Sequence, residues 1–228
     1  MSLFQPAEVS CPVCGELMSF DLCTSVNADR RPDLRLEILA ATFQRVPCTA
    51  CGTTVQLPPA LTYMDVGRGQ WILAKPAPDY ANWESLEAIA RDTFSLSYGP
   101  AASRPAREIG RRLTPRITFG WAALREKLLA CEEGIDDVTL ELLKLAVLRS
   151  VSGAPLHDDS ELRLIDATDA TLVLAWLVSA TEQQLSTLDV PRGALDGIAA
   201  EDDAWATLRV RLTDALFVDF SRLLLQPV

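Results

Sequence analysis

Two short cysteine pairs constrain this chain more than any other feature of its sequence. Each pair has the spacing Cys-x-x-Cys and is closed by a glycine, as Cys11-Pro12-Val13-Cys14-Gly15 and Cys48-Thr49-Ala50-Cys51-Gly52. Four thiolates supply a complete tetrahedral shell for Zn²⁺. A glycine after the second cysteine permits the backbone conformation that such a metal-binding turn, or knuckle, usually needs. The sequence therefore predicts one structural zinc site on Cys11, Cys14, Cys48 and Cys51.

Other interpretations of these cysteines remain open. Two redox pairs would need a thioredoxin-like strand–helix context, which neither pair has. Four unrelated buried thiols would not explain two glycine-closed pairs. The third alternative is a zinc deaminase, because Cys14, Glu16, Cys48 and Cys51 mimic that signature, with Glu16 as general acid/base. Against it, Cys11 would fill the position that a catalytic zinc keeps open for water, and Glu16 leads into a strand pattern instead of a helix.

Composition indicates an ordinary folded protein of the cytoplasm. The chain has 228 residues, of which 49% are hydrophobic, enough for one large domain or two small ones. Its first residues lack the basic and apolar regions of a signal peptide. No stretch approaches the ~18 consecutive apolar residues of a membrane span. A disulfide framework is not expected from the six cysteines, since four of them sit in the two pairs.

Hydrophobic periodicity predicts an α+β protein in two parts, residues 1–77 and 78–228. The first part is expected to be a zinc-ribbon-like antiparallel β module with one inserted helix. Its expected elements are a strand at 17–26, a helix at 33–41, strands at 42–46 and 53–57, and a β-hairpin over 61–75 with a glycine turn at 67–69.

The second part is expected to be an α+β domain with a helical hairpin and a long C-terminal helix. The pattern predicts helical spacing over 79–98, a loop at 99–107, a strand at 117–119, an antiparallel helix pair at 121–131 and 138–149, strands at 162–165 and 171–178, a helix from 181 to 188, and the final helix at 203–225.

Charge is unevenly distributed along the chain. The net charge of −10 disfavours generic nucleic-acid binding, and residues 132–203 hold sixteen acids and four bases. By contrast, residues 104–116 hold five arginines and one glutamate. These arginines are a candidate anion-binding or acidic-partner surface, and the simpler interpretation is a solvated face. Binding of nucleic acid through the zinc ribbon would need such residues to converge on one face: Arg104, Arg107, Arg111, Arg112 and Arg116.

A second candidate for catalytic chemistry is the single histidine. His157 stands beside Asp158 and Asp159, and Ser152 or Ser160 could complete a nucleophile–histidine–acid arrangement. A lone histidine in a polar turn is more often solvated. The alternative to a non-catalytic protein is therefore an enzyme, either a zinc-dependent hydrolase or deaminase at the cysteine site or a cleft chemistry that involves His157.

The chain resembles the CpXC-motif proteins of bacteria and archaea. The resemblance covers both glycine-closed cysteine pairs, the insert between them, the Tyr63-Met64-Asp65 stretch, and the later region 117–148. Thr49 stands where the family commonly has proline, which leaves metal ligation untouched. The resemblance implies a zinc-ribbon-like fold and carries no activity with it.

We therefore expect a non-catalytic cytoplasmic protein in which one zinc stabilises a protein-interaction or adaptor module. Its partner is expected to be another protein. Structural zinc contributes an apparent ~10–16 kcal/mol in small zinc-folded peptides, so loss of the metal is expected to unfold residues 1–77.

Overall fold

A five-stranded mixed sheet organises the first half of the chain. The computed structural model describes residues 2–151 and 160–225. The sheet has the strand order β1-β2-β5-β6-β7, in which β2 pairs with β5 and β6 pairs with β7 in parallel, while the other neighbours are antiparallel. Its strands are β1 (Leu3–Ser10), β2 (Leu17–Asn27), β5 (Leu61–Asp65), β6 (Gln70–Lys75) and β7 (Thr114–Phe119).

Helices cover both faces of this sheet, and strand β6 shows why. Side chains alternate between the faces of a strand. Ile72 and Ala74 pack with α1 (Pro32–Leu39) and α4 (Trp121–Glu132), whereas Trp71 and Leu73 pack with α2 (Trp83–Tyr98). Because both faces are buried, β6 is apolar at consecutive positions instead of alternate ones.

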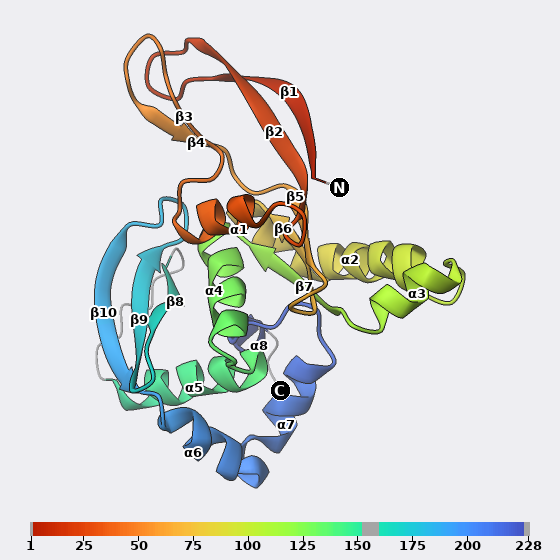
Figure 1. The fold of residues 1–228 in the computed structure, drawn as a ribbon. Coiled ribbons are helices and arrows are strands. Elements are labelled where there is room, and N and C mark those ends of the chain that lie inside the picture. Colours follow the sequence, from red (N-terminus) through yellow and green to blue (C-terminus); the bar gives the residue numbers. More distant parts are fainter. Residues whose placement is uncertain (1, 152–159, 226–228) are drawn as a thin grey trace.

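The C-terminal part adds a second, smaller sheet. The antiparallel strands β8 (Ser160–Ala167), β9 (Thr171–Val178) and β10 (Gln184–Pro191) have the order β10-β9-β8. Their inner face packs against α5 (Asp137–Ser150), α6 (Ala194–Ala200) and α7 (Asp202–Thr213), with Leu140, Leu164 and Leu174 almost fully buried. Figure 1 shows α4 between this sheet and the central one.

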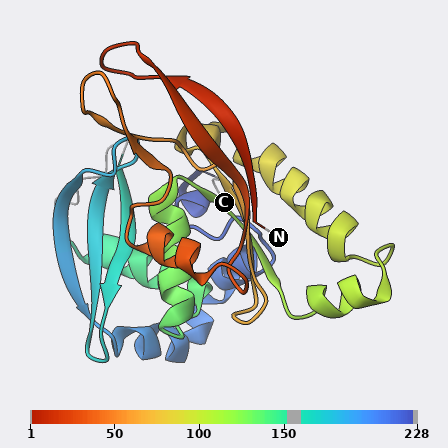
Figure 2. The ribbon, with the colours of Figure 1, turned by 45° about the horizontal axis from the view of Figure 1, so that its top comes forward.

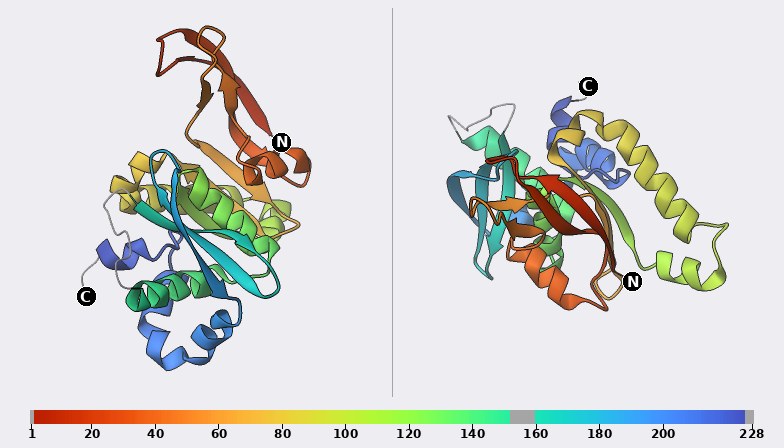
Figure 3. Two further views of the ribbon diagram at one scale, coloured as in Figure 1. Left: turned by 90° about the vertical axis from the view of Figure 1, so that its left-hand side faces the viewer. Right: turned by 90° about the horizontal axis from the view of Figure 1, so that it is seen from above.

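The two cysteine pairs lie on a projecting tip. Strands β1 and β2 extend beyond the body as a two-stranded ribbon, and the short hairpin of β3 (Arg45–Pro47) and β4 (Thr54–Gln56) lies beside it (Figures 1 and 3). We call the outer part of these two hairpins, residues 9–22 and 45–57, the tip. Its own small core contains Met18, Phe20, Val55 and Leu57.

The expectation of an α+β protein is confirmed, but the sheet is mixed and not an antiparallel module. Strand β7 lies beyond residue 77 and pairs with β6 over six residues, from Gln70↔Thr114 to Lys75↔Phe119. The central sheet therefore continues across the boundary placed after residue 77. Parallel pairing of distant strands leaves no local sequence signal, since it depends on a connection of many residues.

Helices α4 and α5 are present, but they do not form an antiparallel hairpin. Figure 1 shows α5 running across the end of α4. The joint is short: Gly134 has φ +65°, Ile135 donates to the Ala130 carbonyl, and Asp136 caps α5 through the Thr139 N–H. Three- or four-residue joints serve crossing helices as well as antiparallel ones, so the length alone was not decisive.

Residues 181–188 are not a helix. Thr181-Glu182-Gln183-Gln184 forms a tight turn, in which Glu182 has φ +56° and donates its N–H to the Val178 carbonyl. The Thr181 hydroxyl accepts from Gln183, as in a capping box, but the chain then continues as β10 and pairs with β9. The same side-chain bond that caps a helix can close a turn.

The prediction of one long C-terminal helix is also wrong. Helix α7 ends at Thr213, a non-helical segment at residues 214–220 follows, and α8 spans Ser221–Leu225. In the segment, the N–H groups of Leu216 and Phe217 donate to the Glu87 carboxylate, and the Leu216 carbonyl accepts from Ile117. These distant partners replace the main-chain bonds that a continuous helix would have made.

In the part of the chain that the structure describes, none of the helices has the length and apolar character needed to cross a membrane.

Candidate metal centre

The two knuckles have the same main-chain geometry. Cys11 donates to the Glu16 carbonyl and accepts from Gly15, and Cys48 makes the equivalent bonds with Thr53 and Gly52, all at 2.8 or 2.9 Å. Gly15 and Gly52 have φ angles of +77° and +73°. No atom lies within 4 Å of a Cβ added at either glycine, so the backbone conformation and not crowding requires glycine here.

These knuckles bring the four predicted sulfurs together. The Sγ atoms of Cys11, Cys14, Cys48 and Cys51 all lie within 4.8 Å of one another. Cys11 and Cys51 are 3.7 Å apart and Cys14 and Cys48 are 3.6 Å apart, so each of these pairs joins the two knuckles. A tetrahedral site with metal–sulfur bonds of ~2.3 Å has sulfur–sulfur edges of about 3.8 Å. The arrangement is therefore compatible with one metal ion bound by all four cysteines.

The position of the four cysteines divides the site into an inner and an outer half. Cys11 and Cys48 are buried in the core of the tip, while Cys14 and Cys51 are exposed. Hydrogen bonds from the Thr53 hydroxyl and N–H lower the pKa of Cys51 to about 6. The Glu16 N–H lowers the pKa of Cys14, but desolvation and the three neighbouring sulfurs outweigh it and raise the pKa to about 12. Without a cation, the four thiols cannot all ionise, because each thiolate opposes the next.

Polar contacts of the Gln44 and Trp121 side chains help to join the tip to the residues around it. The Gln44 side chain, beside β3, accepts from the Cys23 N–H and donates to the Asp21 carbonyl of β2, both at 3.0 Å. The Trp121 indole N–H, at the start of α4, donates to the Leu57 carbonyl at 2.7 Å. The orientation of the tip on the body therefore depends in part on these polar bonds, of which the one from Trp121 is buried.

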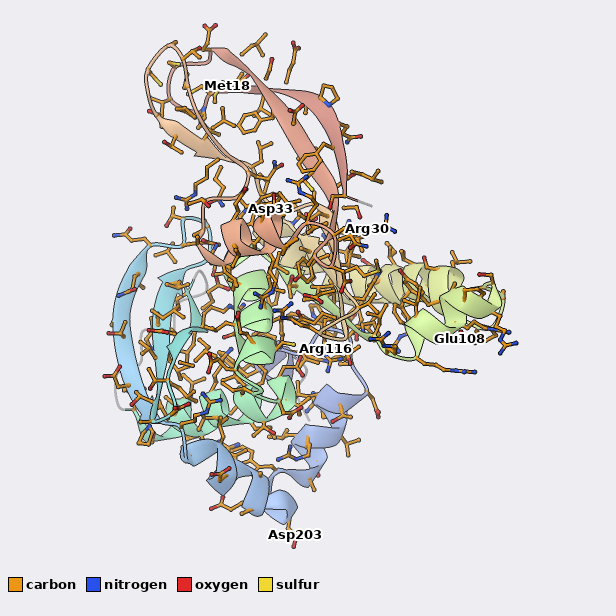
Figure 4. The ribbon with its side chains drawn as sticks, in the orientation of Figure 1. Met18, Arg30, Asp33, Glu108, Arg116 and Asp203 are labelled. Carbon is orange, nitrogen blue, oxygen red and sulfur yellow. The ribbon has the colours of Figure 1, made fainter. Side chains whose placement is uncertain are left out.

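The five arginines of the predicted anion surface do not lie together. Helix α3 (Arg104–Gly110) and the residues after it carry four of them at the surface, and Arg116 lies on β7 and binds both oxygens of Asp137, at 2.7 and 3.0 Å. Figure 4 shows Arg116 in the body and Glu108, on α3, at the outer end of a projecting pair of helices. Arg116 therefore has a structural ion pair instead of a place on that surface.

The residues of the enzymatic alternatives are placed as follows. Glu16 is exposed and precedes β2, so it leads into a strand and not into a helix. Cys11 lies within the sulfur cluster, where a catalytic zinc would need an open position. His157 and Ser152 lie outside the residues that the structure describes, and Ser160 begins β8.

Sequence reasoning missed a buried ionic cluster between α4, α5, β8 and residues 214–220. Lys144 contacts Glu126 at 2.6 Å and Glu141 at 3.1 Å, and all three side chains are completely buried. Arg163 joins Glu126 to Asp219, at 3.2 and 2.6 Å. The only sequence signal was a set of charged residues within otherwise apolar stretches, which ordinarily marks a solvated helix face.

Opposing environments shift the pKa values of this cluster in both directions. Burial raises the pKa of Glu141 to about 7, although Lys144 and Lys127 oppose the shift. For Asp219, burial also disfavours the charged form, but Arg163 and Lys144 outweigh it and hold the pKa well below its ordinary value. Clusters of this kind occur at functional sites and in structural networks alike. Here the groups bind one another and the main chain, which favours the structural role.

Two clefts lie beside the α4–α5 joint, and none of the four cysteines lines either one. One of about 500 Å³ opens between the β5–β6 turn and the end of α4, with Arg116, Lys127 and Asp137 in its wall. The other, of about 520 Å³, lies between the α4–α5 joint and α6 and is lined by Asp136, Asp169 and other residues. The metal centre therefore lies apart from both.

Fold and site together define an α+β protein with a mixed sheet and a tip that gathers four cysteines from two equivalent knuckles. The chain belongs to the CpXC family, since residues 9–144 match the family described as CpXC protein. This confirms the resemblance inferred from the sequence, and the match extends from the first knuckle into α5. No curated protein and no solved structure matches the chain.

Proposed function

We propose that this protein is a non-catalytic zinc-binding protein of the cytoplasm, in which one structural zinc holds the tip of a protein-interaction or adaptor module. The main support for this proposal is the cluster of four cysteine sulfurs, which all lie within 4.8 Å of one another and come from two knuckles with the same main-chain geometry. A tetrahedral all-sulfur site favours zinc or an iron–sulfur cluster, and the two glycine-closed knuckles support a zinc-ribbon-like tip.

The structural role of the zinc is supported by how little else stabilises the tip. Its buried core contains Met18, Phe20, Val55 and Leu57 apart from the cysteines themselves. At ~1.5–3 kcal/mol for each large buried side chain, this core is small against the entropy of ordering about 27 residues. An apparent ~10–16 kcal/mol from zinc is of the size needed to hold such a tip together.

The adaptor role is supported by the surface. Large apolar side chains stand exposed on the two projecting parts of the molecule: Val13 and Leu17 on the tip, at 67% and 64%, and Leu96 on α2 at 78%. Exposed apolar groups on a projection are available for contact with another protein. The tip and α3 lie at different ends of the molecule, so the basic residues do not converge with the ribbon as nucleic-acid binding would need (Figure 1).

Elemental analysis of the purified chain tests the proposal. We expect one zinc per chain, and we expect Cys48→Ser to lose it. Cys131→Ser is the matched control, because Cys131 is partly buried on α4, outside the cluster, and burial raises the pKa of its thiol. A folded, metal-free wild type, or an iron chromophore, would refute the zinc assignment.

Hydrogen exchange after chelation tests the structural role separately. The sequence led us to expect that residues 1–77 unfold without the metal. Because β6 pairs with β7, we now expect loss of protection in the tip and continued protection of β5, β6 and β7. A tip that stays protected without metal would show that zinc does not stabilise it.

A further inference from the structure

We infer that helices α2 and α3 form a docking arm for an acidic segment of another protein that also carries large apolar side chains. The arm comprises residues 83–112 and stands away from the body on the side opposite the second sheet (Figure 2). The inference rests on the interaction role proposed above and names the partner's chemistry.

The inner face of the arm packs against the central sheet, which holds the arm in place. Trp83 and Ala90 of α2 are buried against the central sheet, and Phe94 contacts Trp71 with ring centroids 5.3 Å apart. At the outer end, a Cβ added to Gly110 would lie 2.5 Å from the Cβ of Tyr98, so α3 approaches α2 more closely than any other residue type would allow. The arm therefore presents a preformed surface, which lowers the entropic cost of binding.

The opposite face of α2 exposes large apolar side chains. Ile89 and Leu96 are 51% and 78% exposed, and residues seven apart lie on one side of a helix. Asp92 lies between them on the same face. Ile109 of α3 is 37% exposed. On a preformed projection these exposed apolar groups are available to the side chains of a partner.

The charge of α3 specifies the partner. Residues 104–112 hold four arginines and one glutamate, a net of +3 in a chain of net −10, and all four arginines are exposed. Arg104 pairs with Glu108, Arg107 donates to the Pro100 carbonyl, and Arg112 donates to the Val66 carbonyl. Within the described ranges, neither Arg107 nor Arg111 pairs with a carboxylate.

A basic surface on an acidic protein orients its partner. The net negative charge of the rest of the molecule repels acidic segments, whereas residues 104–112 of the arm attract them. Such complementarity chiefly determines the rate of encounter and the choice of partner. The apolar groups of α2 then require that the acidic segment also contribute large apolar side chains. Acidic residues alone would leave Leu96 exposed in the complex.

Peptide binding to the full, zinc-loaded chain tests the inference. The probes are two fluorescein-labelled 16-residue peptides, each with leucines at helical spacing and with either glutamate or lysine at the charged positions. Fluorescence anisotropy should show that the glutamate peptide binds more tightly, and that its binding weakens at high salt. We expect Arg107→Glu/Arg111→Glu to weaken it about tenfold or more, and Leu96→Ser several-fold.

Two exposed residues away from the arm supply matched controls. Arg45→Glu reverses a charge on β3, and Val210→Ser removes a side chain that is 60% exposed on α7. Both variants should bind the glutamate peptide like the wild type. All substituted side chains are exposed, so each variant should keep one zinc and its unfolding midpoint.

Three results would overturn the inference. The lysine peptide could bind as tightly as the glutamate peptide, or the double variant could bind like the wild type. Alternatively, sedimentation could show a concentration-dependent mass that Arg107→Glu/Arg111→Glu abolishes, which would make a second copy of this chain the occupant. Because zinc content is measured on the same samples, failure of peptide binding by zinc-loaded protein refutes the arm alone.

Discussion

Replacing Lys144 by methionine should be among the most damaging single substitutions in this protein. The ammonium group is completely buried and contacts Glu126 at 2.6 Å and Glu141 at 3.1 Å. Methionine preserves most of the volume but leaves two buried carboxylates without their shared cation. Breaking a buried ion pair by removing one partner costs about 3–5 kcal/mol.

That cost is a large share of the free energy of unfolding of the whole protein. The free energy of unfolding of such proteins is typically about 5–15 kcal/mol. A change of 1 kcal/mol shifts the thermal unfolding midpoint by about 2–4 °C, so a loss of about 4 kcal/mol predicts a midpoint lower by roughly 8–16 °C. Lys75→Met is the matched control, because Lys75 is only half-buried on β6. We expect that change to cost less than about 1 kcal/mol.

The stability lost in Lys144→Met should be larger at high pH than at low pH. Burial raises the folded-state pKa of Glu141 to about 7, above its ordinary 4.5, in the presence of Lys144, Lys127, Glu126 and Asp219. A carboxyl whose pKa is higher in the folded than in the unfolded state stabilises the fold when it is protonated. This stabilisation is complete at pH values below the unfolded-state pKa, and it is lost as pH rises through the folded-state pKa of about 7. The wild type should therefore lose up to about 3 kcal/mol between pH 4.5 and pH 8. Without Lys144, Glu141 holds its proton more strongly, so the variant should suffer more at pH 8 than at pH 5.5.

Urea unfolding followed by tryptophan fluorescence at pH 5.5 and pH 8 measures both effects. The double variant Lys144→Met/Glu141→Gln should recover at least about 1 kcal/mol of the loss at pH 8, since it also removes the carboxylate that has lost its nearest cation. If Lys144→Met stays within 1 kcal/mol of the wild type, or loses equal stability at both pH values, the buried ionic cluster does not contribute as described.

Two further substitutions test the tip. Gly15→Ala should cost about 1–2 kcal/mol of tip stability, measured by hydrogen exchange, because the φ angle of Gly15 is +77°. The control is Gly197→Ala in α6, where φ is not positive, and this change should be neutral or stabilising. Trp121→Phe should cost about 1–3 kcal/mol in urea unfolding, because the Leu57 carbonyl loses its 2.7 Å bond, and an unchanged midpoint would contradict this contact.

Local patterns predicted the elements that tertiary contacts do not override. The alternation after the first knuckle became β2, the glycine turn at 67–69 joins β5 to β6, and the expected pair at 121–131 and 138–149 became α4 and α5. Failures occurred where a distant partner competes with local preference. Residues 214–220 leave the helical pattern because the Glu87 carboxylate and the Ile117 N–H, about a hundred residues earlier, satisfy their main chain.

The sequence by itself determined the two knuckles, because each is complete within six residues: two cysteines, a glycine at positive φ and two main-chain bonds. That local geometry needs no distant contact to form. Only the tertiary structure decided that β7 continues the sheet across residue 77, that Arg116 pairs with Asp137 instead of joining α3, and that Lys144 is buried among carboxylates. Each of these depends on chain segments that meet only after folding, where burial gives a charged residue a different role from the one its neighbours in sequence suggest.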